Sequence, residues 1–215
     1  IKSNLSEGVE LVAVSKTKPS SAIKEAYATG QRIFGENRPQ EMQGKAEELP
    51  KDIQWHMIGH LQSKKTKYIA PFVSLIHSVD KLSLLEEINK RAAQNDRIID
   101  VLLQVFIAKE ESKFGMDEDE VIELLNSEAF KTLPNIRVVG LMGMATNTDN
   151  EEVVRQEFKR LKSFFDSIKN SSVSTPLNLT DFTVLSMGMS GDFKIAMEEG
   201  SNMVRIGSSI FGSRN

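Results

Sequence analysis

Cysteine is absent from this chain of 215 residues. A disulfide bond, a thiolate metal site and a cysteine nucleophile are therefore excluded. Histidine is scarce, with three residues in total, and this scarcity disfavours a metal-dependent hydrolase, which needs several clustered ligands.

Long hydrophobic runs and an excess of one charge are missing as well. No apolar run approaches the length that spans a membrane, and no segment has the pattern of a signal peptide. Lys and Arg total 27 against 30 Asp and Glu, a net charge of −3, so no basic field would attract nucleic acid or an anionic membrane. We expect a cytoplasmic protein whose partners are small molecules.

The chain does contain a regular alternation of two kinds of segment. Its composition, 40% hydrophobic and 27% charged, suits one globular domain over residues 1–215. Short apolar runs rich in Val and Ile alternate with longer segments of helical periodicity. The predicted strands are residues 10–16, 32–36, 54–59, 73–79, 100–106, 137–144, 184–189 and 203–208.

Repeated strand–helix units predict a parallel sheet. The clearest helical segment has apolar residues in steps of four and three, at Val154, Phe158, Leu161, Phe165 and Ile168. Eight such units in about 200 residues fit an α/β fold of the closed (β/α)8 TIM-barrel type, with an open doubly wound sheet as the alternative.

The first predicted strand ends at Lys16, on the same face as Val12 and Val14. A lysine that points inward at the end of a buried strand is costly unless it loses its charge or reacts. A solvated lysine at a strand end is the alternative interpretation.

Two turns of small residues near the end of the chain suggest a phosphate-binding site. Residues 186–191 and Gly207-Ser208 close two apolar runs, after the seventh and eighth predicted strands, where barrel phosphate sites often form. Gly and Ser let a phosphate approach backbone N–H groups, and we expect Ser190 to cap a helix that adds further donors. A phosphate site beside a buried amine suggests pyridoxal 5'-phosphate.

Arg205 is predicted to point inward from the last strand, together with Met203 and Gly207. A buried guanidinium needs a specific acceptor, and an ion pair with a carboxylate such as Glu36 is one alternative.

His56 and His60 straddle the end of the third predicted strand, at a spacing that can indicate zinc on a helix. The segment is a strand and a third ligand is not evident, so we predict no metal.

Several stretches together resemble one known family, the pyridoxal phosphate homeostasis proteins, whose fold is similar to the barrel domain of alanine racemase. They occur in order along nearly the whole chain, which makes the joint pattern highly specific. The stretches are Ala13-Val14-Ser15-Lys16-Thr17, Phe34-Gly35-Glu36-Asn37, Trp55-His56-Met57-Ile58-Gly59-His60-Leu61-Gln62, His77-Ser78-Val79-Asp80, Gly140-Leu141-Met142, and residues 185–192 and 204–212.

This resemblance implies a role for individual residues toward the cofactor. Lys16 would carry pyridoxal 5'-phosphate as a Schiff base, Arg205 would face the pyridine nitrogen, and Asn37 and Met142 would lie near the ring. The residues implied around the phosphate are Ser186, Gly188, Met189, Ser190, Gly207 and Ser208. The chain departs from the family pattern at Lys64 and Phe106, where the family usually has Asn.

The function expected from the resemblance is intracellular vitamin B6 homeostasis: the protein would hold the cofactor for apo-enzymes that use it, without catalytic turnover. A racemase using the same barrel is the alternative, but it needs a second base on the opposite face of the cofactor. The only tyrosines, Tyr27 and Tyr68, fall in helix-like segments, which disfavours the racemase. The predicted helices show no apolar seam, which favours a monomer over a homodimer.

Overall fold

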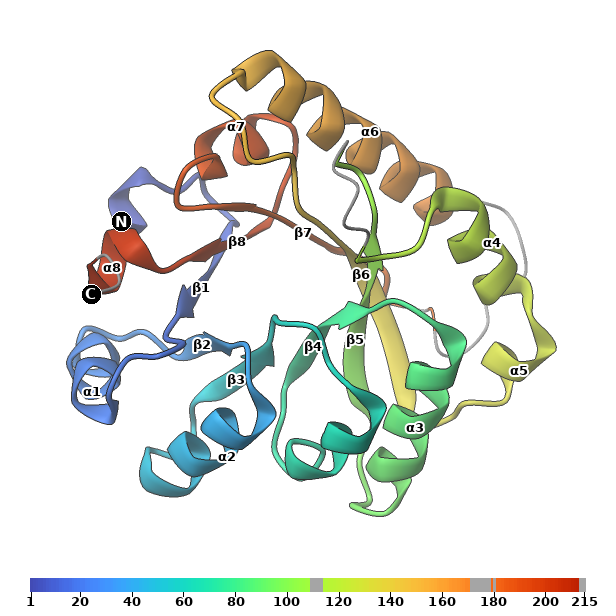
Figure 1. Cartoon of the computed structure of the whole chain (residues 1–215), viewed down its shortest axis with the longest axis horizontal. Coiled ribbons are helices and arrows are strands. Elements are labelled where there is room, and N and C mark those ends of the chain that lie inside the picture. Colours follow the sequence, from blue (N-terminus) through green and yellow to red (C-terminus); the bar gives the residue numbers. More distant parts are fainter. Residues whose placement is uncertain (109–113, 171–178, 180, 213–215) are drawn as a thin grey trace.

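The computed structural model describes residues 1–108, 114–170, 179 and 181–212. Its centre is a closed barrel of eight parallel strands, in which each strand pairs with its neighbours in chain order and the last pairs with the first (Figure 1). The strands are Glu10–Val14 (β1), Ile33–Glu36 (β2), Gln54–Met57 (β3), Leu75–Val79 (β4), Ile99–Val105 (β5), Ile136–Gly143 (β6), Val184–Met189 (β7) and Met203–Ile206 (β8).

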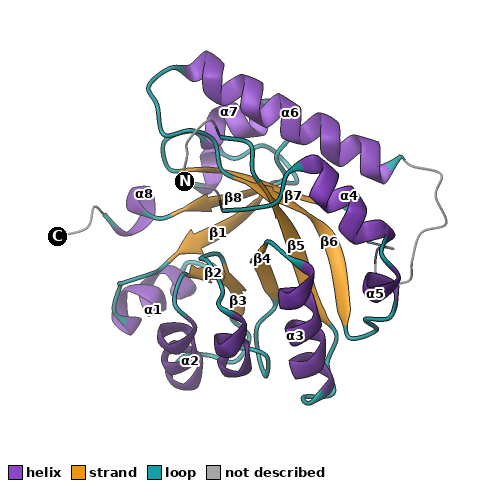
Figure 2. Ribbon diagram, turned by 45° about the vertical axis from the view of Figure 1, so that its right-hand side comes forward, coloured by secondary structure: helices purple, strands orange, loops and turns teal. Residues whose placement is uncertain are grey.

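Helices follow the strands and surround the barrel, as Figure 2 shows in purple around the orange strands. The TIM-barrel prediction is therefore confirmed, and the open doubly wound sheet is wrong because β1 and β8 pair. The α-helices are Ser20–Ala28 (α1), Pro39–Glu48 (α2), Leu82–Ala93 (α3), Glu118–Asn126 (α4), Glu128–Lys131 (α5), Glu151–Lys169 (α6), Phe193–Glu198 (α7) and Ser208–Phe211 (α8), with 3-10 helices at Lys2–Asn4 (η1) and Ser63–Tyr68 (η2).

Local signals in the sequence explain several helix starts. Pro39 is the first residue of α2, where its missing N–H leaves no hydrogen bond unmade. Asp117 caps α4, since its Oδ1 accepts from the N–H of Glu120 at 2.8 Å and the Glu120 side chain accepts from the N–H of Asp117 at 2.8 Å.

The apolar face of α6 packs against the barrel wall as its periodicity predicts. All five residues of the predicted stripe are buried, among them Phe158 and Leu161, which are fully inaccessible. No helix in the described part of the chain combines the length and hydrophobicity that crossing a bilayer requires.

A second apolar cluster fills the inside of the barrel. Its buried members come from β1, β4, β5, β6 and β8 and from no helix, so they form the packed interior typical of this fold. They are Val12, Leu75, Leu102, Val139, Met142 and Met203. This apolar layer fills the barrel interior toward the amino ends of the strands. Polar residues lie at the carboxyl ends of the strands.

Candidate functional site

A pocket of about 310 Å³ opens where the strands end. Its walls come from the ends of β1, β2, β3, β6, β7 and β8 and the segments that follow them, the face on which TIM barrels carry their sites. Seven of the ten predicted site residues line it, namely Lys16, Asn37, Met189, Ser190, Arg205, Gly207 and Ser208. Residues near the start of the chain and residues near its end therefore line the same pocket.

The other three predicted residues do not line the pocket. Ser186 is fully buried in β7, below Arg205, and Met142 belongs to the apolar layer inside the barrel. Gly188 has a φ of +95°, and a Cβ there would lie 2.6 Å from the Cβ of Ala196. Its lack of a side chain lets α7 approach the strand.

Ser190 does not cap the helix that follows, so that expectation is wrong. Helix α7 begins at Phe193 after Asp192, and the Asp192 carboxylate accepts from the N–H of Met189 at 2.6 Å. The hydroxyl of Ser190 instead accepts from the N–H of Gly207 at 3.2 Å. This bond ties the turn after β7 to the turn after β8, across the pocket wall.

Gly207 allows the last strand to approach the first. A Cβ at this position would lie 3.2 Å from both the Cβ and the carbonyl oxygen of Val14, closer than ordinary contact. Gly207 is also the residue before α8, whose first N–H groups have no acceptor within the helix. Ser190, Gly207 and Ser208 all line the pocket here.

Lys16 lies two residues beyond β1, half-buried in the pocket wall. The strand stops at Val14, earlier than predicted, and the backbone turns at Thr17. The hydroxyl of Ser15 donates to Glu36 Oε1 at 2.6 Å, and Thr17 has a φ of +65°, strained for a β-branched residue.

A buried cluster of charges holds this turn, and we call Lys45, Glu36 and Glu41 the lysine clamp. The Nζ of Lys45 donates to Glu36 Oε1 at 2.8 Å, to Glu41 Oε1 at 2.7 Å and to the carbonyl oxygen of Ser15 at 2.9 Å. The same oxygen of Glu41 accepts from the N–H of Thr17 at 2.7 Å. The clamp thus engages the residues on both sides of Lys16.

The pKa values of the two clamp carboxyls shift in opposite directions, although burial acts to raise both. Glu36 is fully buried, and this burial raises its pKa despite the hydrogen bonds from Lys45 and Ser15. Burial alone would also raise the pKa of Glu41, but the bonds from Lys45 and from the Thr17 N–H lower it overall. Glu36 accepts hydrogen bonds from Lys45 and Ser15. The suggested ion pair between Glu36 and Arg205 is wrong.

Arg205 lies at the floor of the pocket with 4% of its surface exposed. Its Nη1 donates to the carbonyl oxygen and the Oγ of Ser186, at 3.0 and 2.6 Å, and its Nη2 donates to the Gly143 carbonyl at 3.1 Å. Burial lowers the pKa of Arg205 to about 10, so the guanidinium is still charged at neutral pH.

No carboxylate within the described ranges comes within 4 Å of this cation. Asp192 acts on it only through its longer-range field. A buried charge normally has a partner of opposite sign. The pocket therefore suits an anionic ligand.

Asn37 adds a polar group from the end of β2. Its Oδ1 is buried and has no hydrogen-bond partner among the described residues. Buried polar atoms of this kind call for an explanation, and a ligand in the pocket that Asn37 lines is one.

In the structure, His56 and His60 have different neighbours. His56 contacts His77, not His60, with 3.0 Å between Nδ1 of His56 and Nε2 of His77. His60 faces Asp80 at 3.6 Å between Nδ1 and Oδ2. Three potential metal ligands do not gather anywhere in the described part of the chain. His77 stands in one of the stretches that match the family but was given no role from the sequence, although it faces inward from β4 as His56 does from β3.

The two departures from the family pattern lie away from the pocket. Lys64 is an exposed residue of η2, and Phe106 follows β5 and donates its N–H to the Met116 carbonyl at 2.8 Å. Neither lines the pocket, so these two differences leave its walls unchanged.

Comparison with known proteins gives one consistent result. The model of the family described as alanine racemase, N-terminal domain, matches residues 1–215. The chain is 42% identical over 207 residues to a pyridoxal phosphate homeostasis protein of Aquifex aeolicus, covering 95% of this chain and 87% of that relative. A protein of the same description from Vibrio alginolyticus is 40% identical over 214 residues, covering 97% and 88%.

Comparison with solved structures gives the same result. The structure of PipY from Synechococcus elongatus with PLP bound is 36% identical, with a TM-score of 0.86 over 98% of this chain and 96% of that one. Alanine racemase from Clostridium difficile is 15% identical and supports the fold alone, with a TM-score of 0.75 over 99% of this chain and 55% of that one.

Removal of the clamp cation should destabilise the protein strongly. Lys45→Met leaves Glu36 and Glu41 without their shared partner, and we expect a loss of about 3 kcal/mol in the free energy of unfolding, measured with urea. Lys24→Met is the matched control, because its exposed pair with Glu48 at 3.7 Å should change stability by less than about 0.5 kcal/mol. A loss below about 1 kcal/mol for Lys45→Met would contradict the clamp.

The buried histidines predict an acid-sensitive fold. Burial lowers the pKa of His56 to about 3 and that of His77 well below its usual value, so the unfolded chain binds more protons. Their contribution is complete above about pH 6.5 and declines below it, by about 1.4 kcal/mol per pH unit for each histidine. Unfolding in urea between pH 5.5 and 7.5 measures this slope.

His77→Asn should remove about half of that slope, because one of the two buried imidazoles is then absent. An equal slope in the wild type and in His77→Asn would show that other groups cause the acid sensitivity.

Proposed function

Since this chain belongs to the pyridoxal phosphate homeostasis proteins, built on the N-terminal barrel of alanine racemase, we propose that it holds pyridoxal 5'-phosphate as a Schiff base on Lys16 without catalytic turnover. The observation that carries the proposal is that Lys16 and the buried cation of Arg205 line one pocket. In this proposal the protein serves vitamin B6 homeostasis in the cytoplasm, as a monomer that supplies apo-enzymes.

The pocket residues fit this cofactor. Lys16 would supply the primary amine that condenses with the aldehyde of the cofactor: a C=N bond would replace the C=O bond, and the oxygen would leave as water. The cofactor is anionic, which suits a pocket whose floor is a cation without a carboxylate partner among the described residues. Asn37, whose buried oxygen has no partner in the part of the chain that the structure describes, would bind a polar group of the ring.

The lysine clamp supports the role of Lys16. It fixes the carbonyl of Ser15 and the N–H of Thr17, so the backbone on either side of Lys16 keeps its position when the side chain reacts. Holding a reactive group in place lowers the entropic cost of the reaction. No residue of the clamp needs to touch the cofactor.

The phosphate would bind between the turns after β7 and β8. Ser190, Gly207 and Ser208 line the pocket there, with Met189 at its edge. We do not include three of the predicted residues among the proposed contacts. Ser186 bonds to Arg205, Gly188 lets α7 approach its strand, and Met142 packs inside the barrel.

Arg205 disfavours transamination in this proposal. A guanidinium has donors only, so one that faces the pyridine nitrogen disfavours a proton on that nitrogen. An unprotonated ring is a poorer electron sink for the carbanion that transamination needs.

The pocket also offers no tyrosine as a second base. The hydroxyl of Tyr27 donates to Asp52 at 2.7 Å, and the ring of Tyr68 lies beneath Lys65 and Lys67; neither lines the pocket within the described residues.

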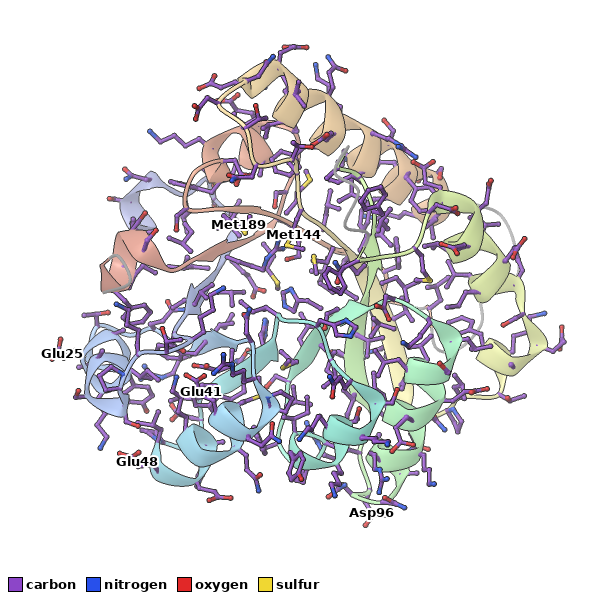
Figure 3. All side chains as sticks on the ribbon, in the orientation of Figure 1. Glu25, Glu41, Glu48, Asp96, Met144 and Met189 are labelled. Carbon is purple, nitrogen blue, oxygen red and sulfur yellow. The ribbon has the colours of Figure 1, made fainter. Side chains whose placement is uncertain are left out.

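Exposed methionines mark the mouth through which the cofactor would pass. Met144 and Met189 line the pocket and are 38% and 39% exposed, and Figure 3 labels them near each other in the middle of the view. Flexible apolar side chains at an opening suit contact with more than one partner. This feature is consistent with delivery to apo-enzymes.

Lys16→Ala should abolish the covalent adduct and keep the fold, because the change removes a reactive group and little packing. The measurement is the imine absorbance with added pyridoxal 5'-phosphate, followed by borohydride reduction and peptide mapping. Lys18→Ala is the matched control, since Lys18 lines the same pocket and should leave the adduct on Lys16. A reduced adduct that persists in Lys16→Ala would refute the assignment.

The protein loaded with the cofactor should not exchange the α-proton of an amino acid. With L-alanine in deuterated water, we expect no deuterium at Cα and no D-alanine beyond a control with free cofactor, measured by proton NMR and chiral chromatography. Exchange that depends on Lys16 would favour the racemase alternative instead.

A further inference from the structure

Four buried side chains form a hydrogen-bonded chain across the inside of the barrel. Arg205 on β8 contacts Ser186 on β7 at 2.6 Å, Ser186 Oγ lies 3.2 Å from His77 Nδ1 on β4, and His77 Nε2 lies 3.0 Å from His56 Nδ1 on β3. Their exposed fractions are 4%, 0%, 0% and 4%. The pocket residue Arg205 is thereby linked to two histidines that do not line the pocket.

The available donors and acceptors determine in which direction the hydrogen bonds between these four side chains run. A guanidinium only donates, so Ser186 Oγ accepts from Arg205 and directs its own proton elsewhere. The other printed distance from Oγ leads to His77 Nδ1, which must then be the acceptor. A neutral imidazole without a proton on Nδ1 carries it on Nε2, so His77 donates to Nδ1 of His56.

The opposite direction of hydrogen bonding would leave one proton without an acceptor. If His77 donated from Nδ1 to Ser186 Oγ, that oxygen would accept two hydrogen bonds and its own proton would need a third partner. The described contacts of Ser186 Oγ are those to Arg205 and His77 alone. A buried hydroxyl proton without an acceptor costs free energy, so the first direction is favoured.

We propose that His77 is a positioning residue: as the acceptor of the Ser186 hydroxyl proton, it turns the Ser186 oxygen toward Arg205 and so holds that cation at the floor of the pocket. His56 fixes the tautomer of His77 by accepting from its Nε2. Burial supports this state, because it lowers the pKa of both rings and keeps them neutral.

The effect on ligand binding rests on the proposed function. Arg205 has three neutral acceptors, of which the Ser186 hydroxyl is the nearest. If that hydroxyl lost its acceptor, its proton could turn toward the guanidinium and displace it. The cation would then be misplaced for the cofactor, although neither His77 nor Ser186 lines the pocket.

The first test is independent of the cofactor. Long-range proton–nitrogen NMR of the free protein at pH 7 distinguishes protonated from bare ring nitrogens, and His60→Gln and His77→Asn assign the signals. We expect His77 and His56 to be neutral and protonated on Nε2. A proton on Nδ1 of His77, or a charged His77, would overturn the proposal.

The second test compares two substitutions of one residue. His77→Asn keeps an oxygen near the place of Nδ1, so affinity for pyridoxal 5'-phosphate should stay within about twofold of the wild type. His77→Leu removes the acceptor and should weaken binding about tenfold, as should Ser186→Ala, which removes the hydroxyl. Absorbance titration of the imine measures all three, with circular dichroism as the check on folding.

The outcomes separate this proposal from the proposed function. Equal losses in His77→Asn and His77→Leu would mean that His77 only fills space, which overturns the positioning role. A wild-type protein that forms no adduct on Lys16 would end the proposed function, whereas the NMR result would still decide the direction of the chain. If His77→Leu fails to fold, Ser186→Ala and the NMR result decide.

Discussion

The pairing of the first strand with the last is the constraint on which the site depends. Val12 on β1 lies opposite Arg205 on β8, in a register of four residue pairs. This pairing closes the barrel and brings Lys16, near the start of the sequence, to the same pocket as Arg205 and Gly207, near its end. A shift by one residue would turn Arg205 out of the barrel, because side chains alternate along a strand.

Two polar systems support the two charged residues of the pocket. The lysine clamp holds the turn of Lys16 from the outer side of β1 and β2, and the histidine chain holds Arg205 from inside the barrel. Buried polar groups add little net stability, and an incomplete network is costly. Their value here is that each fixes the position of a group on which the proposed chemistry depends.

The sequence predicts much of this arrangement because its signals are local. Strand and helix periods locate the eight units, and Pro39 and Asp117 mark helix starts that the structure has. The end of β1 was harder to predict, since alternation continues through Lys16 while the clamp and the strained Thr17 end the strand at Val14. The capping role of Ser190 failed because its hydroxyl bonds to a residue 17 positions away.

Long-range polar contacts were the part that one sequence could not provide. Ser186 and His77 are separated by 109 residues, and nothing in the pattern around either indicates the other. The glycines near Ser186 favoured a phosphate contact for it, whereas the closed barrel directs its side chain beneath Arg205. The sequence feature that could have grouped these residues is the direction of their side chains. From four different strands, all of them point into the barrel: His56, His77, Ser186 and Arg205.

The central claim is that one pocket holds pyridoxal 5'-phosphate between Lys16 and Arg205. A crystal structure of the protein grown with the cofactor tests it most directly. We expect continuous electron density from Lys16 Nζ to the cofactor, the phosphate beside Ser190 and Ser208, and the ring nitrogen facing Arg205. Cofactor bound to another lysine, or a ring turned away from Arg205, would contradict the account.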